Sequence, residues 1–312
     1  MERLVNIEPD DSKEKEALIL KHEYPFRLAT FQDVHIGSQM ALWHEDIMDR
    51  YGNRIVPNEG QKILWSYLEH YIGVLKKLKI KVLLCPGDMI AGTNPKEYGR
   101  YMLPIDLNSQ VEACAWIINY IAERVPSLEQ VMLWRGTPYH GSRDVELIEM
   151  LETILYKDYG IQATYNGPYS YLVFERDGKK KVFWIGHPAT EAVVYPETAM
   201  GRDIMFFQQK YGEGKLPKVD LIIRAHKHEY IELHKASMRE ILLPCWQFFV
   251  PFDRAVKWYP KYQPDIGGVT ILLDEELRIR PWHWIYPNIV DPLRFIKIKA
   301  DGKVFLTRLG RA

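Results

Sequence analysis

KIKVLLCPGDMI, residues 79–90, is the stretch from which the fold of this 312-residue chain can be worked out. Residues 79–85 form a short, largely apolar run, which is typical of a buried β-strand. A glycine follows, and its backbone freedom lets the chain turn sharply as it leaves the strand. The next residue is Asp88. The stretch therefore predicts a core strand that places a carboxylate just beyond its carboxyl end.

The segments around this strand repeat the same kind of element. Strands are expected at residues 24–31 and 131–135, and a helix at residues 145–159. Apolar residues also recur at helical spacing before and after residues 79–85, at Leu64, Tyr67, Leu68, Tyr71, Ile72, Leu75 and Leu78, and at Val111, Cys114, Ala115, Ile118, Ile121 and Val125. Strands and helices thus alternate through the first half, which predicts a layered α/β sheet with crossover connections.

The second half is expected to contain mainly short strands. Residues 164–187 alternate and are predicted to form a hairpin that turns at Asp177-Gly178. Further strands are predicted within residues 219–226, 229–235, 238–244 and 267–282. No Gly/Ser-rich or Pro-rich linker divides the chain, so one domain is expected over residues 24–285.

The two ends are expected to lie outside that domain's pattern. Residues 1–23 are interpreted as a polar lead-in with a short helical stretch around residues 14–21. Residues 286–312 alternate around Asp301-Gly302 and predict a C-terminal β-hairpin that packs on the same domain.

Composition narrows the function classes. The chain has 41 basic and 41 acidic residues, a formal net charge of zero, which argues against a protein that binds nucleic acid mainly through its overall field. Three cysteines without a CxxC pair argue against a disulfide framework or a zinc knuckle. No signal peptide and no apolar run of membrane-spanning length is recognisable. We therefore expect a cytoplasmic protein without a membrane partner; the sequence leaves its oligomeric state open.

Acids and histidines follow the predicted strands in order. Ligands of open α/β sheets bind beyond the carboxyl ends of the strands, and the residues found there are Asp33, His35, Asp88, His140, His187, His226 and His228. Any one of these histidines alone could be a half-exposed loop residue. The ordered series instead favours a metal site, because two ions about 3.5–4 Å apart need several such ligands and a shared anion. Mixed imidazole and carboxylate ligands suit Mn, Fe, Zn or Ni.

The series resembles the signature of the calcineurin-like metallophosphoesterase superfamily, which is D-x-H, G-D, G-N-H-D/E, an isolated H and G-H-x-H. The matching blocks, which span about two thirds of the chain, are QDVHIGS (32–38), PGDMI (86–90), RGTPYHG (135–141), IGHP (185–188) and AHKH (225–228). The resemblance implies an α/β four-layer sandwich of two mixed β-sheets flanked by helices, with two divalent metal ions at one sheet edge.

The resemblance also implies a division of ligands between the two ions. One ion is expected to bind Asp33, His35 and His228. The other is expected to bind His187 and His226, and Asp88 is expected to bridge the two. Manganese is the preferred metal, with iron, zinc and nickel as alternatives.

The third block departs from the signature. The chain has Gly136-Thr137-Pro138-Tyr139-His140, so Thr137 occupies the asparagine position and the histidine is displaced by two residues. Thr137 and His140 are the two candidate catalytic residues. Two catalytic-site roles are open for His140, a general acid to the leaving oxygen or a replacement metal ligand. The alternative is an ordinary loop histidine before a helix that begins near Ser142. Ala225 in place of the usual glycine is a minor change, because alanine is also small.

The predicted function is that of a metal-dependent phosphoesterase, in which a hydroxide activated by the metal ions attacks phosphorus. Phosphodiesters of nucleic acid or nucleotides are the preferred substrates, because residues 245–264 interleave aromatic and cationic side chains and the C-terminal hairpin is basic. An interface or packed loop is the alternative reading of residues 245–264. Residues 89–105 and 188–203 are expected to be loops that wall the pocket, where Arg100 or Arg202 could bind phosphate.

Two alternatives to this function remain open from the sequence. One is a phosphomonoesterase or protein phosphatase, and the other is a catalytically inactive scaffold with the same fold. No G-x-S-x-G element and no P-loop motif is present, which disfavours a serine hydrolase or an NTPase.

Overall fold

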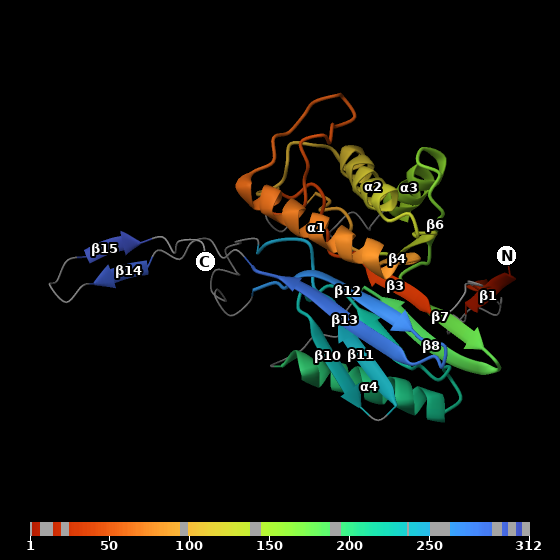
Figure 1. Ribbon diagram of the computed structural model, residues 1–312. Helices are drawn as coiled ribbons and strands as arrows, with labels where there is room; N and C mark the ends of the chain where they lie inside the picture. Colours follow the sequence, from red (N-terminus) through yellow and green to blue (C-terminus); the bar gives the residue numbers. More distant parts are fainter. Residues whose placement is uncertain are drawn as a thin grey trace.

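Two mixed β-sheets face each other in the computed structural model, and helices cover the outer face of each (Figure 1). The structure describes residues 2–6, 15–19, 25–93, 99–137, 145–187, 195–235, 237–249, 263–288, 295–298 and 304–307.

The first sheet has six strands in the order β13-β12-β3-β4-β5-β6. Their bounds are Ile279–Tyr286 for β13, Ile266–Leu273 for β12, Phe26–Thr30 for β3, Val82–Cys85 for β4, Gln130–Leu133 for β5 and Ala163–Tyr165 for β6. Strands β3 to β6 are parallel, whereas β12 is antiparallel to both of its neighbours. Strands β3, β4 and β5 are the ones predicted to alternate with helices, as crossover connections require. Strand β6 contains residues expected to belong to the hairpin of residues 164–187, but it pairs with β5 in this sheet.

The second sheet has five strands in the order β10-β11-β9-β8-β7. Their bounds are Ile231–Lys235 for β10, Met238–Leu242 for β11, Leu221–Arg224 for β9, Lys179–Gly186 for β8 and Tyr169–Arg176 for β7. Strands β8, β9 and β11 are parallel, and β7 and β10 are antiparallel edges. The β7–β8 hairpin turns at Asp177 and Gly178, which both have positive φ, as predicted.

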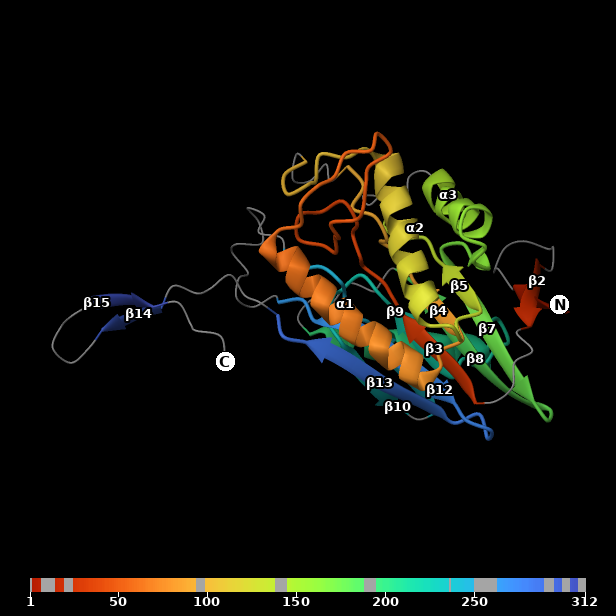
Figure 2. The ribbon, with the colours of Figure 1, turned by 45° about the horizontal axis from the view of Figure 1, so that its top comes forward.

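The helices complete four layers. Helices α1 (Glu59–Leu78), α2 (Leu107–Arg124) and α3 (Val145–Lys157) pack on the six-stranded sheet, and in Figure 2 they lie on the near side of its strands. Helix α4 (Pro196–Gly212) covers the five-stranded sheet. The expected α/β four-layer sandwich is therefore confirmed.

The core between the sheets explains why residues 79–85 are so apolar. In β4, Val82 and Leu84 face the second sheet, whereas Leu83 and Cys85 face the helices, and all four are fully buried. A strand covered on both faces needs apolar residues at every position. Complete burial of each such leucine or valine contributes roughly 1.5–3 kcal/mol.

Two local predictions were wrong. The stretch around residues 14–21 contains a strand, β2 (Lys15–Ile19), which pairs with β1 (Glu2–Asn6) in an antiparallel register; the alternation was too short to be distinguished from a helical pattern. Residues 196–203, expected as a loop, begin α4, which has Pro196 in its first turn. Pro is favoured at the first helical position.

The C-terminal hairpin prediction was right in its secondary structure. Strands β14 (Phe295–Ile298) and β15 (Val304–Thr307) pair antiparallel on either side of Asp301-Gly302. In the described part of the chain, no helix combines the length and apolar character needed to cross a bilayer.

Candidate metal centre

The loops after β3 and β4 run together and bring three predicted ligands to one sheet edge. The backbone N–H of Asp33 donates to Gly87 O at 3.1 Å, and that of His35 donates to Asp88 O at 3.0 Å. These bonds continue the pairing of two parallel strands beyond their ends. Residues that are 53 or more positions apart in the sequence therefore lie beside one another, as the strand order predicted.

The second sheet supplies the other three predicted ligands. His187 directly follows β8, and His226 and His228 follow β9, the parallel neighbour of β8. The backbone N–H of His226 donates to Asp33 Oδ2 at 3.0 Å, which joins the two sheets at their edges. The six residues thus converge from four strand ends in two sheets.

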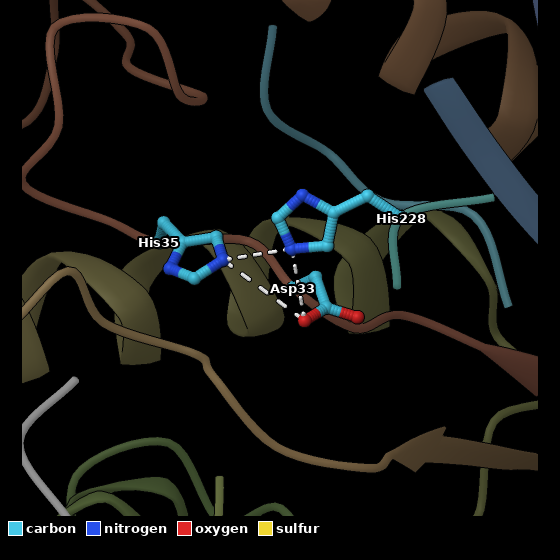
Figure 3. Close-up of side chains that lie close together, drawn as sticks. All are labelled: Asp33, His35 and His228. Atoms are coloured by element: carbon cyan, nitrogen blue, oxygen red, sulfur yellow. Dashed lines mark hydrogen bonds and ion pairs between the residues drawn. The ribbon is translucent and has the colours of Figure 1, made fainter. Parts of the chain in front are cut away.

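One cluster consists of Asp33, His35 and His228, which point toward one another (Figure 3). His228 Nε2 lies 3.2 Å from Asp33 Oδ1 and 3.2 Å from His35 Nε2. His35 Nε2 lies 3.9 Å from the same carboxylate oxygen. Two imidazole nitrogens and one carboxylate oxygen therefore converge in a space that a single cation could fill.

A second cluster consists of Asp88, His187 and His226. His187 Nε2 lies 2.9 Å from Asp88 Oδ2, while its Nδ1 is 2.8 Å from Pro86 O. The carbonyl accepts the Nδ1 proton, so Nε2 is the nitrogen directed at the cluster; such a contact is how proteins orient metal-ligating histidines. His187 Nε2 is also 3.9 Å from Asp33 Oδ1, so the two clusters adjoin.

Burial and the charges of the site shift the pKa values of two histidines in opposite directions. Burial acts to lower the pKa of His187, but the carboxylates of Asp88 and Asp33 raise it to about 9. Loss of solvation and the neighbouring His187 lower the pKa of His226 to about 4. Two buried carboxylates therefore favour positive charge at this site, and a metal cation can supply that charge in place of a proton.

The backbone at the site adopts an unusual conformation. Among the described residues, nine non-glycine residues have positive φ, and five of them belong to the two clusters: Asp33, His35, Asp88, His226 and His228. Such conformations cost about 1–3 kcal/mol each and persist where the surrounding structure holds them. They turn successive side chains toward a common point, which regular strand geometry would not do.

Two glycines permit the close approach of the loops. A Cβ on Gly87 would lie 2.5 Å from His187 Nδ1, and one on Gly136 would lie 2.1 Å from Asp88 Oδ1. Real Cβ atoms are not found so close to other heavy atoms. The sequence identified Gly87 as a turn residue, but the need for glycine at 136 became visible only from the packing.

Of the two residues predicted to have catalytic roles, one can be placed. Thr137 lies against Asp88: its backbone N–H donates to Oδ1 at 2.7 Å, and its hydroxyl lies 3.2 Å and 3.1 Å from the two carboxylate oxygens. His140 lies outside the described residues, as does much of the aromatic-cationic segment 245–264. Arg100 and Arg202 are described and exposed; a phosphate-binding role for either stays a prediction.

The residues present fit metal ions. In each cluster the three ligand atoms lie within 4.8 Å of one another. Asp33 Oδ1 and His187 Nε2 are buried, and neither forms a well-oriented hydrogen bond within the described part of the chain. Each nevertheless lies near a group of opposite charge, His228 and Asp88 respectively. Buried polar atoms are costly to leave in this way. A divalent ion in each cluster would satisfy them.

Comparison with known proteins adds several solved structures of low similarity. An archaeal phosphodiesterase is 12% identical, with a TM-score of 0.39, and the match covers 83% of this chain and 100% of that one. Vps29 from Cryptosporidium parvum is 10% identical, with a TM-score of 0.38, over 85% and 99% of the two chains. Vps29 from Entamoeba histolytica in complex with Zn²⁺ is 9% identical, with a TM-score of 0.35, over 83% and 99%.

No protein-family model and no curated protein matches the chain. Similarity at this level carries no argument about activity. The fold and the site therefore rest on the sequence blocks and on the geometry described above.

Proposed function

We propose that this chain is a phosphoesterase that uses two divalent metal ions, with Asp33, His35 and His228 holding one ion, His187 and His226 the other, and Asp88 shared between them. The observation that carries the proposal is the adjacency of the two clusters, in which Asp33 Oδ1 lies 3.2 Å from His228 Nε2 and 3.9 Å from His187 Nε2. Asp33 Oδ1 thus lies close to a histidine of each cluster. Two independent metal sites would not require this arrangement.

Two ions at such a site supply activation of water and polarisation of phosphoryl oxygens. The protein's own groups provide the rest. The Pro86 carbonyl fixes the orientation of His187, the backbone N–H of His226 holds Asp33, and Thr137 holds Asp88. These contacts keep the ligands in place before substrate arrives, which favours catalysis because little reorganisation is needed.

We propose phosphodiesters of nucleic acid or nucleotides as the substrate class and manganese as the preferred metal. The support is the sequence of residues 245–264, where aromatic and cationic residues alternate as in proteins that stack bases. A phosphomonoesterase or protein phosphatase, and an inactive scaffold, are the competing possibilities.

The test is hydrolysis of bis-p-nitrophenyl phosphate and of p-nitrophenyl phosphate by metal-free protein to which Mn²⁺ is added back. We expect hydrolysis that depends on the metal, with a higher kcat/KM for the diester. A higher value for the monoester would reverse the substrate class. No hydrolysis of either ester with both sites loaded would favour the scaffold.

We propose that His140 is the general acid that protonates the leaving oxygen. The support is the sequence alone: a proline at position 138 restricts its own φ and the conformation of Thr137, so we expect a well-defined position for His140. For His140→Ala we expect kcat to fall by about 10²–10⁴ with metal content unchanged. Loss of one ion per chain would instead make His140 a ligand, and full activity with full metal content would make it an ordinary loop histidine.

A further inference from the structure

Thr137 touches the carboxylate that the two proposed metal positions share, and it does so with two groups at once. Its backbone N–H donates to Asp88 Oδ1 at 2.7 Å, within the range of strong charge-assisted hydrogen bonds. Its hydroxyl lies 3.2 Å from Oδ1 and 3.1 Å from Oδ2. Thr137 therefore contacts the carboxyl group of Asp88 through both its backbone and its side chain.

The two oxygens of Asp88 have different surroundings as a result. Oδ1 packs against Gly136, where a Cβ would come within 2.1 Å of it, and it accepts from the Thr137 amide. Oδ2 lies 2.9 Å from His187 Nε2, inside the second cluster. The backbone of Gly136 and Thr137 thus holds Oδ1, while Oδ2 is directed at the histidine and also lies within reach of the Thr137 hydroxyl.

The type of residue at position 137 matters for the hydroxyl contact with Asp88 but not for the amide contact. The amide contact is available to any residue except proline, whereas the hydroxyl contact needs threonine or serine at position 137. Asp88 itself has φ of 49°, a conformation that must be held by its neighbours. A hydroxyl that spans both oxygens restrains rotation of the carboxyl group about its last bond.

We propose that Thr137 is a positioning residue that fixes the Asp88 carboxylate and thereby sets the affinity of the metal position formed by Asp88, His187 and His226. The inference rests on the proposed two-metal function. It differs from a direct role as ligand, because the hydroxyl acts on the carboxylate and not on the ion. Outer contacts of this kind typically change metal affinity by about 10–100-fold when they are lost.

The test is titration of metal-free protein with Mn²⁺ by calorimetry, with three variants. Thr137→Val keeps the shape and the amide but removes the hydroxyl, and we expect at least one of the two binding steps to weaken by about 10–100-fold. Thr137→Ser restores the hydroxyl and is expected to bind within about threefold of the unsubstituted chain. The matched control is Thr164→Val in β6, which removes a partly buried threonine hydroxyl that accepts from Gln130 Nε2 of β5 and should leave both steps unchanged.

The outcomes separate this inference from the function on which it rests. If the unsubstituted chain binds no Mn²⁺, the proposed function fails. If it binds two ions and Thr137→Val binds both with unchanged affinity, the positioning role alone is wrong. Weak binding by Thr137→Ser would also overturn it, even if Thr137→Val proved too unstable to titrate, because serine offers the same hydroxyl.

Discussion

At the scale of single residues, Asp88 is the position where substitution should have the largest effect. Asp88→Asn keeps the size of the side chain but removes the charge proposed to be shared by two ions. We expect both ions or nearly all phosphoesterase activity to be lost, as measured by metal analysis of the purified variant and turnover of a diester. Asp177→Asn is the control, because it lies in the exposed β7–β8 turn, where asparagine also tolerates positive φ. Two tightly held ions with normal turnover in Asp88→Asn would show that Asp88 is not shared.

Gly136 offers a second prediction, which depends on space alone. The Cβ of Gly136→Ala would lie 2.1 Å from Asp88 Oδ1 and 2.3 Å from the Asp88 backbone nitrogen, so the loops must separate. We expect metal affinity to fall by at least tenfold, about 1.4 kcal/mol of binding free energy. Gly73→Ala is the control: apart from the adjoining backbone of α1, no atom of the described residues lies within 4 Å of its Cβ. In the interior of α1, alanine should stabilise the fold by about 0.5–1 kcal/mol. Equal metal affinity in the two variants would contradict the close approach.

The six residues of the two clusters could be predicted from the sequence because strand ends are recognisable and the order of acids and histidines follows them. The contacts that hold these side chains in place could not. Thr137 and Asp88 are 49 positions apart, and His226 and Asp33 are 193 apart. Whether such pairs touch depends on how two sheets approach each other, and no local pattern records that distance.

At the scale of elements, a buried charged cluster ties α4 to the strand that leads to His226. Arg224 at the end of β9 lies 3.0 Å from Asp203 of α4 and 3.3 Å from Glu240 of β11, measured from its Nε. Glu240 is fully buried. Burial is the main cause that raises the pKa of Glu240 to about 8, and Asp203 adds to it against the effect of Arg224.

This cluster predicts how stability depends on pH. Glu240 holds its proton in the folded state up to about pH 8 but loses it near its ordinary value in the unfolded state, so the unfolded state binds fewer protons between these values. Stability should therefore fall as pH rises from about 5 to 8. Because each pKa unit is worth about 1.4 kcal/mol, the fall should exceed about 1 kcal/mol. Glu240→Gln should lack this contribution.

Urea unfolding of the metal-free chain and of Glu240→Gln at pH 5 and pH 8 measures this difference. Between pH 5 and pH 8, the free energy of unfolding of Glu240→Gln should rise relative to that of the unsubstituted chain. Glu232→Gln on the neighbouring strand β10 is the control, since Glu232 is exposed and should show no such gain. The raised pKa of Glu240 would be contradicted if the difference in free energy of unfolding between Glu240→Gln and the unsubstituted chain were the same at both pH values.

The elements themselves divide into those that local patterns predict and those that they do not. Helix α1 begins with a reciprocal capping box between Asn58 and Gln61 and has a continuous apolar stripe, so its position was clear. Helix α4 was missed because its pattern is blurred: Met205, Phe206 and Tyr211 are exposed while Ile204 and Phe207 are buried. For β2, five residues are too few to separate a strand period from a helical one.

At the scale of the whole molecule, the balance of 41 basic and 41 acidic residues limits how the chain can meet its substrate. Phosphate contacts dominate non-specific affinity for duplex DNA, and each depends on cationic side chains. We expect no tight, sequence-independent binding of duplex DNA at physiological salt. A gel-shift titration checks this, and sub-micromolar binding there would show that a local basic surface outweighs the neutral total.

The sandwich architecture accounts for why the site lies where it does. Each sheet ends its central parallel strands at the same edge, and the hydrogen bond from His226 N–H to Asp33 joins the two edges. Neither sheet alone carries all three residues of either cluster, because His228 completes the first and Asp88 completes the second. Correct packing of the two sheets is therefore a condition for both proposed metal positions.

The central claim is that two adjoining clusters hold two divalent ions that support hydrolysis. Its most direct test is titration of the metal-free chain with Mn²⁺, in which bound metal and hydrolysis of bis-p-nitrophenyl phosphate are measured in the same samples. We predict saturation at two ions per chain and hydrolysis that rises with occupancy of the second position. Saturation at one ion or none, or hydrolysis that is the same without added metal, would contradict it.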